Sequence, residues 1–449
     1  MKCSAASTGD SRDSYRTGLL RLVEASSPGM RLGLDSTRRL LDRLDDPQAD
    51  LRGVLVAGTN GKGSVCALVA EMARRAGIRV ALLTKPHLTS YRERIRLAGE
   101  PIDKDFFVEI ANSVCDAADG MASHGGRPTH HELLTSMGFL AARRWGADLV
   151  VCEVGLGGRL DATNVWDGGV AVLTSISLDH QALLGDTIPL IAREKAAIIK
   201  PGNLVVSGVP AEALPAVETA AAAAGGRLWR LGREIAVQAD AGPAQRFEVS
   251  TPVRTRPGLR VGLEGSFQVA NAALAVAVVD CLCEQGFAIS DTALRQGLAE
   301  VRWPGRMEMI GSPPWCLVDA AHNPGAVQAA IPGIQRLLER RDGILLFGAM
   351  EDHDHRGMLQ ALASVDFRGV VFTRANSARA ASTASLAKGW AYSHEDVEPV
   401  ARALARAREL AGADGLVVAL GSIYLVGELT ASLGVGVEPD PEVPFPPLW

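Results

Sequence analysis

The sequence predicts an α/β fold in which a mostly parallel sheet domain with a phosphate loop is followed by a smaller α/β domain. Three observations carry this prediction. Apolar runs alternate with helical patterns, a glycine-rich loop follows the first of those runs, and a second alternating series begins after residue 301. Because a domain usually holds ~100–200 residues, the 449-residue chain is expected to form two, over residues 1–301 and 302–449.

The first domain is predicted to contain a parallel sheet covered by helices. Its strands are expected at the short apolar runs 54–57, 80–83, 147–154, 170–176 and 204–207. A helix is expected over 67–76, directly after the glycine-rich loop. The segment 227–263 consists of short alternating pieces instead, so we expect a small antiparallel β subsheet at the end of this domain.

The second domain is predicted to be a smaller, Rossmann-like α/β unit. Its strands are expected at 316–320, 344–347, 370–373 and 416–420. Between the two series, Pro304 and Gly305 disfavour continuous helix or strand, which places the hinge at 301–306. The tail from residue 437 carries five prolines and is expected to run extended over the surface.

Composition excludes several classes of function. Apolar residues make up 47% and charged residues 22% of the chain, and the net charge is −5 with no Lys/Arg block, so a nucleic-acid partner is not expected. The N-terminus lacks the apolar core of a signal peptide, and no apolar run approaches the ~18–20 residues that span a bilayer. We therefore expect a cytoplasmic protein without a membrane partner.

The seven cysteines are consistent with a reducing cytoplasm. They include no CxxC pair and their number is odd, which supports neither structural zinc nor a disulfide framework. Cys152 and Cys316 lie in strand-like runs and are interpreted as small hydrophobic core residues.

The most informative stretch is VAGTNGKGS, residues 56–64. A strand, a glycine-rich turn and a helix in this order cradle phosphate, with Lys62 adding a full positive charge and Ser64 a hydroxyl that can ligate Mg²⁺. The expected ligand is a nucleoside triphosphate with magnesium. The loop departs from GxxxxGK[ST], because Val56 replaces the first glycine and Gly63 separates Lys62 from Ser64.

Other polar residues follow predicted strands, where open α/β sheets bind ligands. Glu153 ends a buried strand and is placed to ligate Mg²⁺, with a capping or salt-bridged carboxylate as the alternative. Arg159 and Asp161 can reach a substrate or pair with each other on the surface. His180 can take a metal or be structural. Lys195 lies among apolar neighbours, where its amine either loses solvation and becomes reactive or reaches water.

Together these pieces resemble the folylpolyglutamate synthase and dihydrofolate synthase family of the Mur ligase superfamily. GLGGRLDATN looks like the version in bifunctional bacterial members. The resemblance spans nearly the whole chain and rests on motifs in the family's order: VAGTNGKGS, TKPHLTSYRERI (84–95), EVGLGGRLDATN (153–164), LDHQALLGDT with EKAAIIKPG (178–202), GSFQVANAALA (265–275), WPGRME (303–308), VDAAHNP (318–324), FGAMEDHD (347–354) and GSIYLVGE (421–428).

The resemblance implies a site for ATP and two Mg²⁺ ions. The implied phosphate and nucleotide contacts are Thr59, Asn60, Gly61, Lys62, Gly63, Ser64, Asn271 at the adenine, Arg306 at the phosphates and Asp319 at the ribose. The implied metal ligands are Ser64, Glu153, His180 and Lys195, the last carbamylated by CO₂. Lys62, His180, Lys195 and His322 are the implied catalytic residues. Contacts from both sides of the hinge imply that domain closure assembles the site.

The resemblance also implies the substrates. ATP would convert a carboxylate of dihydropteroate or a folate into an acyl phosphate, which the amine of L-glutamate then attacks. The family is often monomeric. The implied pterin contacts are Met30, Arg31, Leu32, Thr129, Arg159, Leu160 and Asp161.

Several residues depart from the family's pattern. Lys85 stands where the family usually has a serine that ligates magnesium. The other departures are His131 for a phenylalanine, Ala320 for a glycine, His353 for a lysine, and Arg31 where some relatives are acidic. They keep open a paralogue that ligates another aromatic acid, a folylpolyglutamate synthase without the first activity, or a decayed ATP-binding regulatory protein.

Two further alternatives explain less of the sequence. A P-loop kinase or GTPase accounts for the phosphate loop and for none of the later motifs. A cell-wall Mur ligase is disfavoured because only 57 residues precede Gly58, too few for an additional domain that binds the UDP sugar.

Overall fold

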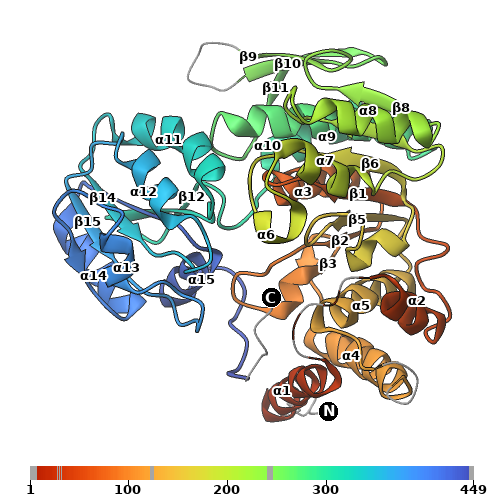
Figure 1. Cartoon of the computed structure of the whole chain (residues 1–449), viewed down its shortest axis with the longest axis horizontal. Coiled ribbons are helices and arrows are strands. Elements are labelled where there is room, and N and C mark those ends of the chain that lie inside the picture. The colour runs from red at the N-terminus through yellow and green to blue at the C-terminus, as the bar shows by residue number, and fades with distance from the viewer. Residues whose placement is uncertain are drawn as a thin grey trace, which may run out of the picture.

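The computed structural model describes residues 8–27, 29, 31, 33–121, 126–239 and 246–443. Its first part is built on an eight-stranded sheet in the order β4-β3-β2-β5-β1-β6-β7-β8 (Figure 1). β3 and β4 run antiparallel at one edge, and the other strands are parallel. The strands are β1 Gly53–Ala57, β2 Val80–Leu83, β3 Ile95–Leu97, β4 Glu100–Pro101, β5 Leu149–Glu153, β6 Gly169–Leu173, β7 Leu204–Ser207 and β8 Arg227–Arg230.

Helices cover both faces of this sheet because alternate strand residues point to opposite sides. Leu55 and Cys152 pack on the face covered by α1, α4, α5 and α8, whereas Val54 and Val151 pack under α3, α9 and α10. The helices are α1 Thr8–Ala25, α2 Asp35–Asp42, α3 Lys62–Arg75, α4 Lys104–Asp119, α5 His130–Trp145, α6 Gln181–Leu184, α7 Ile188–Ala196, α8 Leu214–Ala223, α9 Phe267–Glu284 and α10 Asp291–Glu300.

A separate three-stranded antiparallel sheet lies at the far end of this part (Figure 1). It consists of β9 Ala236–Ala239, β10 Arg246–Ser250 and β11 Thr255–Arg260. The predicted β subsheet is therefore confirmed, with one correction. The strand β8, inside the same predicted segment, pairs in parallel with β7 and extends the main sheet instead.

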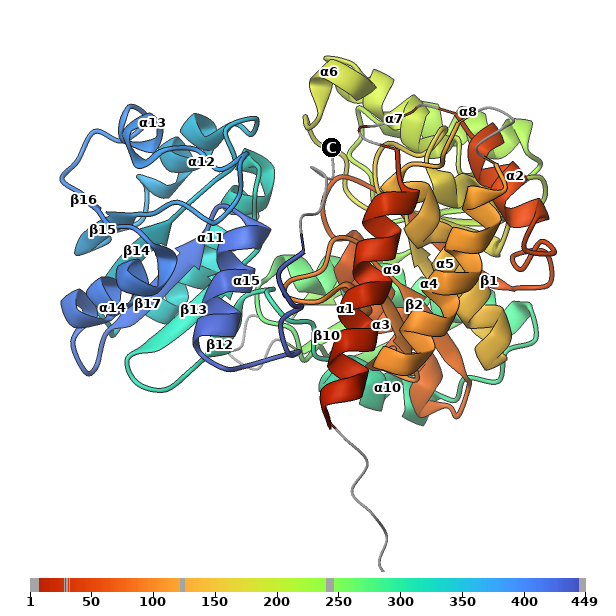
Figure 2. The ribbon, with the colours of Figure 1, turned by 90° about the horizontal axis from the view of Figure 1, so that it is seen from below.

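The second part has its own six-stranded sheet in the order β12-β13-β17-β14-β15-β16, lying beside the first part (Figure 2). Only β12 is antiparallel. The strands are β12 Glu308–Ile310, β13 Trp315–Asp319, β14 Gly343–Phe347, β15 Gly369–Phe372, β16 Glu395–Asp396 and β17 Leu416–Leu420. Around them pack α11 Pro324–Leu338, α12 His355–Leu362, α13 Thr383–Ala387, α14 Val400–Ala411 and α15 Ile423–Ser432.

The observed elements confirm the predicted α/β class. Each of the nine strands predicted as an apolar run is present, with bounds shifted by at most three residues. The predicted helix after the phosphate loop begins at Lys62, five residues earlier than expected. No helix or strand forms between Glu300 and Glu308, as expected of the hinge. The division of the chain at residues 301 and 302 stays a prediction.

The helix α9 corrects one expectation. Its 18 residues are long and apolar enough to cross a membrane by length and composition, whereas no apolar run of that length was expected from the sequence. Within the described residues it is the single helix of this kind, and 72% of it is buried inside the protein. Val276 and Val278 are fully buried against the central sheet, so α9 is a core helix.

The last described residues return from the second domain to the first. Asp440 accepts hydrogen bonds from Tyr15 Oη at 2.8 Å, Ser90 Oγ at 2.6 Å and the Tyr91 backbone N–H at 2.7 Å. Thr89 Oγ1 donates to the Val437 carbonyl at 2.9 Å. The described part of the predicted extended tail thus holds the loop that follows β2.

Candidate active site

The phosphate loop lies between β1 and α3 and is shaped by close backbone approaches. Gly58 has φ 153°, and a Cβ there would lie 1.8 Å from Thr174 Oγ1. Gly61, at φ 86°, caps α3 in the left-handed conformation that favours glycine. Lys62 Nζ folds back and donates to the carbonyls of Gly58 at 3.1 Å and Thr59 at 3.0 Å. The loop therefore holds its own lysine above the helix N-terminus.

The segment after β6 fixes the loop from the neighbouring strand. The Thr59 N–H donates to the Ser175 carbonyl at 2.7 Å, and Thr174 Oγ1 donates to the Asn60 carbonyl at 2.7 Å. The Ser177 N–H donates to Thr59 Oγ1 at 3.2 Å. These bonds use the Thr59 N–H, the Thr59 hydroxyl and the Asn60 carbonyl, and they leave the N–H groups at the start of α3, which are the usual phosphate donors.

Ser64 is 2% exposed and faces the N-terminal turn of α9. Gln268 Nε2 donates to Ser64 Oγ at 3.3 Å, and Asn271 Nδ2 donates to Gln268 Oε1 at 2.8 Å. Asn271 Oδ1 also lies 2.6 Å from where a Cβ on Gly61 would be. The structure thus brings the predicted residues Ser64 and Asn271 together. Gln268 was missed, because only its spacing of three from Asn271 on one helix signals it.

Glu153 ends β5, which lies between β1 and β2. Its buried carboxylate accepts the Lys85 backbone N–H at 3.1 Å. Burial raises the pKa of Glu153, although the charges of Lys62, Arg306 and Lys85 oppose the shift. In the described part of the chain no Lys or Arg side chain reaches ion-pair distance of this carboxylate, so the salt-bridge alternative is wrong.

Lys195 lies on α7 and is 5% exposed, so its side chain does not reach water as the alternative supposed. Its Nζ donates to the Gly58 carbonyl at 2.9 Å, which places the amine directly behind the phosphate loop. Burial, together with the charge of Lys62, lowers the pKa of Lys195 to about 7. Gly158 lets the glycine-rich turn approach, since a Cβ there would lie 2.9 Å from Lys195 Cα.

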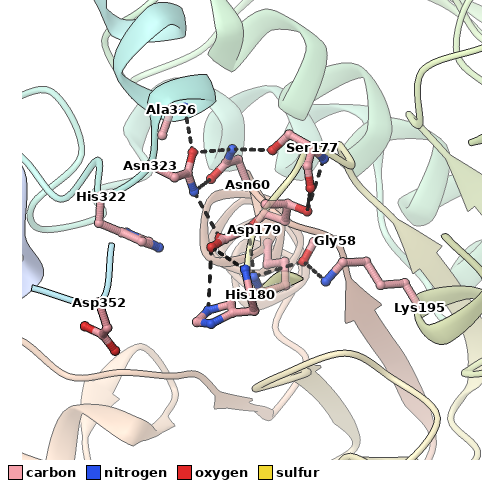
Figure 3. A network of polar contacts seen from close by, with 12 residues as sticks. Gly58, Asn60, Ser177, Asp179, His180, Lys195, His322, Asn323, Ala326 and Asp352 are labelled. Atoms are coloured by element: carbon pink, nitrogen blue, oxygen red, sulfur yellow. Dashed lines mark hydrogen bonds and ion pairs between the residues drawn. The ribbon is translucent and has the colours of Figure 1, made fainter. Parts of the chain in front are cut away.

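His180 belongs to a polar network that joins the two domains (Figure 3). Its backbone is left-handed at φ 49°, and its Nε2 lies 3.8 Å from Asp179 Oδ1. Asp179 Oδ2 accepts from Asn323 Nδ2 at 3.2 Å. Asn323 also exchanges amide hydrogen bonds with Asn60 at 3.1 and 3.2 Å. Asp179 and Asn323 were missed, although both lie inside the quoted motifs LDH and AHNP.

Two further histidines come from the second domain. His322 Nδ1 lies 2.9 Å from the Ala320 carbonyl, and burial lowers the pKa of His322 to about 4. The ring of His353, one of the departures from the family, lies 5.3 Å from that of His322 and 6.3 Å from that of His180. The predicted catalytic residues His180 and His322 thus flank His353.

Arg306 and Asp319 lie where the hinge enters the second domain. Arg306 Nη1 donates to the Gly305 carbonyl at 3.0 Å. Asp319 accepts from the backbone N–H groups of Met307 at 2.9 Å and Ala321 at 2.8 Å, and its burial raises its pKa. Met307 is left-handed at φ 46°, so Asp319 holds a strained turn. Its predicted ribose contact remains a prediction.

Asp161 organises the glycine-rich turn after β5. Its carboxylate accepts the backbone N–H groups of Gly155 at 3.1 Å, Leu156 at 2.9 Å and Thr163 at 3.0 Å. His131 Nε2 lies 3.1 Å from the same carboxylate. Burial opposes ionisation, but His131, the charge of Lys85 and these hydrogen bonds hold the pKa of Asp161 well below its usual range.

The remaining predicted pterin residues are spread around this turn. Arg159 is exposed and pairs with Glu194 at 2.9 Å, so the suggested pair with Asp161 is not formed. Leu160 is half-buried beside it, and Arg31 is exposed. Thr129 Oγ1 caps α5 by accepting the Glu132 N–H, and its predicted pterin contact stays a prediction. Met30 and Leu32 lie outside the described residues.

The predicted metal ligands suit a magnesium ion that is also bound by phosphate and water better than a metal ion bound by protein side chains alone. Across the described ranges, no three His, Cys, Asp or Glu side chains are grouped to hold a metal ion. Glu153 nevertheless offers a buried carboxylate without a paired cation, close to the phosphate loop. Mg²⁺ commonly uses one or two carboxylates and completes its shell with phosphate oxygens and water. The donor set therefore suits a nucleotide-bound Mg²⁺.

Fold and site together define an ATP-dependent ligase of the Mur type, and family profiles agree. The Mur ligase middle domain matches residues 56–279, and the Mur ligase glutamate ligase domain matches residues 305–423. The dihydrofolate synthase/folylpolyglutamate synthase of Bacillus subtilis is 32% identical over 415 residues, which cover 90% of this chain and 96% of that protein. The chain belongs to this dihydrofolate synthase/folylpolyglutamate synthase family.

Solved structures of relatives share the fold. Mycobacterium tuberculosis folylpolyglutamate synthase, complexed with ADP and AMPPCP, has a TM-score of 0.87 at 30% identity, over 95% of this chain and 100% of that one. A bifunctional folylpolyglutamate synthase/dihydrofolate synthase, with Mn, AMPPNP and L-glutamate bound, has a TM-score of 0.81 at 29% identity, over 92% and 99% of the two chains. The family resemblance inferred from the motifs is confirmed.

Proposed function

We propose that this chain joins L-glutamate to dihydropteroate, to the glutamate tail of (tetrahydro)folate, or to both, with ATP as the energy source. The observation that carries the proposal is the phosphate loop beside the buried Glu153, joined to the second domain through the pair Asn60–Asn323. The B. subtilis relative bears both synthase names, and another relative was solved with an ATP analogue and L-glutamate.

The reaction follows from the chemistry of a carboxylate. An oxygen of the acid attacks the γ-phosphorus of ATP, an O–P bond forms, and the bond to the β-phosphate oxygen breaks, releasing ADP. The glutamate amine then attacks the acyl carbon, loses a proton to solvent, and expels phosphate. The products are an amide, ADP and phosphate. Lys62 offsets negative charge on the transferring phosphoryl group. Electrostatic stabilisation of this kind is usually the largest single contribution to lowering the activation barrier.

Magnesium and the nucleotide would be held by residues of both domains. Ser64, Glu153, His180 and carbamylated Lys195 would ligate two Mg²⁺ ions, which supply charge stabilisation on the phosphates. Asn271, Arg306 and Asp319 would contact the nucleotide, and His322 would lie beside the reacting groups. Support comes from the positions of Glu153 and Lys195 on either side of the loop and from the manganese in a relative.

We also propose that Lys195 reacts with CO₂. The neutral amine attacks the carbon, an N–C bond forms, and a proton leaves, so the side chain becomes an anion. Burial of Lys195 supports this, because an amine with a lowered pKa is available for the attack. With ¹³C-bicarbonate, NMR should detect a carbamate carbon that disappears in Lys195→Met and persists in Lys200→Met. Lys200 is a half-buried lysine whose pKa is also lowered by burial. Equal signals in both variants would exclude Lys195.

The acid is expected to bind at the turn around Asp161, with Arg31, Leu160 and Arg159 at its edge. The departures at Lys85, His131, Ala320 and His353 favour one second candidate, a paralogue that ligates a different aromatic acid. His131 is bonded to Asp161 itself, so the altered residue lies at the expected acid site.

We further propose that the protein is a cytoplasmic monomer whose partners are small molecules. Light scattering of the purified protein would test whether it is a monomer.

Phosphate release tests the proposal. It is measured with ATP, Mg²⁺ and L-glutamate while dihydropteroate, tetrahydrofolate and a panel of other aryl acids are supplied in turn. We expect release with dihydropteroate or tetrahydrofolate that requires glutamate. Release with neither folate would overturn the proposal, release with another acid would identify a paralogue, and release with none would indicate a decayed ligase.

A further inference from the structure

Among the described residues, no carboxylate pairs with Lys85, which is a cation in the site. Its Nζ donates to Thr135 Oγ1 at 3.2 Å, while its backbone N–H donates to Glu153. In the described part of the chain no carboxylate lies within ion-pair distance of this ammonium, although the Glu153 and Asp161 carboxylates are near enough for the Lys85 charge to affect their pKa values. A half-buried ammonium has three donors, and one hydroxyl satisfies only one of them.

The strand order separates this ammonium from the phosphate loop. β1, which feeds the loop, β5, which ends in Glu153, and β2, which leads to Lys85, are adjacent in that order. Glu153 is in register with Val56 on one side, and Cys152 with Leu83 on the other. Since neighbouring strands lie about 4.8 Å apart, the ends of β1 and β2 lie roughly 10 Å apart, with Glu153 at the end of β5 between them.

An in-line transfer places its two substrates on opposite sides of the γ-phosphate. A nucleotide held by the phosphate loop would leave the side of β2 and α5, where Asp161 and His131 lie, for the attacking carboxylate. The Lys85 ammonium points to that side, because Thr135 lies on α5 one turn after His131, which is bonded to Asp161. The free donors of Lys85 therefore lie beside the path of the acid.

We propose that the Lys85 ammonium binds the substrate carboxylate that is activated, and so positions it for attack on ATP. This inference rests on the proposed function. One carboxylate oxygen accepts hydrogen bonds from Lys85 while the other forms the new O–P bond. After transfer the same ammonium donates to the acyl carbonyl oxygen, which gains negative charge when the glutamate amine adds. No proton leaves Lys85 in either step.

Binding of the acid is the decisive measurement. The dissociation constant of dihydropteroate is determined with Mg²⁺ and AMPPNP, which blocks turnover, for wild type, Lys85→Met, Lys85→Arg and Lys388→Met. Lys388 is an exposed lysine of the second domain and controls for net charge. Because a hydrogen bond to a charged group is lost, we expect affinity to fall about 10- to 100-fold in Lys85→Met, by less than about fivefold in Lys85→Arg, and not in Lys388→Met.

A ligand without the charge completes the test. The wild type should prefer dihydropteroate to its carboxamide analogue, and Lys85→Met should lose most of this preference while AMPPNP affinity stays unchanged. Unchanged acid affinity in a folded Lys85→Met protein would overturn the inference. If the Mg²⁺ concentration at half-saturation shifted while acid affinity stayed unchanged, Lys85 would act on the phosphates and not on the acid. Failure of the wild type to bind dihydropteroate or tetrahydrofolate would overturn the proposed function as well.

Discussion

The two walls of the site are built in opposite ways. The phosphate-loop wall, residues 58–64, is shaped by backbone: Gly58 and Gly61 allow contacts that a methyl group would block. The acid-side wall, defined by Lys85, His131, Thr135 and Asp161, is shaped by charged and polar side chains. This difference indicates which part of the site tolerates amino-acid substitutions. A backbone wall accepts almost no substitution, whereas a side-chain wall can be retuned for another substrate residue by residue.

The largest effect is expected from one methyl group on the backbone wall. In Gly58→Ala the new Cβ would lie 1.8 Å from Thr174 Oγ1, so the loop must move. Because a displacement of about 1 Å can cost roughly 100-fold, we expect AMPPNP affinity and phosphate release to fall at least that far. Gly77→Ala is the matched control, since Gly77 has φ 82° but no atom within 4 Å of the added Cβ. Wild-type nucleotide affinity in Gly58→Ala would contradict a backbone-built wall.

On the acid-side wall the largest effect is expected from Asp161→Asn. An amide has one acceptor oxygen, so its NH₂ group would face backbone donors such as Gly155 N–H and Leu156 N–H. Leaving buried donors unsatisfied should lower the free energy of unfolding by about 2–3 kcal/mol. Urea unfolding with an unchanged m-value measures it. Asp186→Asn, on an exposed aspartate, should change nothing; equal losses in both variants would refute the role of Asp161.

The same contrast explains what the sequence could predict. The strands β2 and β7 have the predicted bounds because strands buried on both faces appear as short apolar runs. The strands β3, β4, β12 and β16 were missed because they are two or three residues long and lie toward sheet edges, where no apolar run is needed. The phosphate loop was predicted because its glycines act through the backbone, which leaves a local pattern.

Side-chain contacts between residues far apart in the sequence leave no local pattern of this kind. A surface pair between Arg159 and Asp161 was one alternative, but Arg159 is exposed and pairs with Glu194 on α7. Asp161 pairs instead with His131, on a helix that precedes it by 30 residues. Gln268 reaches Ser64 across 204 residues of sequence. Such contacts depend on how helices pack on the sheet, which local periodicity does not encode.

Acid should weaken the side-chain wall. Burial lowers the pKa of His130, beside this wall, to about 3, and also lowers the pKa of His131. The unfolded chain, with an ordinary histidine pKa of about 6.5, therefore binds protons that the folded chain refuses. This contribution to the free energy of unfolding is fully present above pH ~6.5, and below that pH His130 lowers it by about 1.4 kcal/mol per pH unit.

Unfolding free energies of wild type and His130→Phe between pH 7.5 and about 4 check this dependence. As the pH falls, the free energy of unfolding should decrease less steeply in the variant than in the wild type. The difference between the two slopes should equal the contribution of one histidine, about 1.4 kcal/mol per pH unit. His394→Phe, on an exposed histidine of the second domain, serves as the control. Parallel curves for wild type and His130→Phe would show that His130 titrates alike in both states.

The smallest effect is expected where the C-terminal tail supports the acid-side wall from behind. Asp440→Ala removes the acceptor for Tyr15, Ser90 and the Tyr91 N–H, and so loosens the loop that begins at Lys85. The phosphate-loop wall has no contact with Asp440, so the KM for the acid should rise about two- to fivefold, equivalent to 1 kcal/mol or less, while that for ATP stays constant. Glu442→Ala, on an exposed residue of the same tail, should change neither value. Equal increases in both KM values would mean that the tail controls closure of the two domains, and that the two walls are less independent than their construction implies.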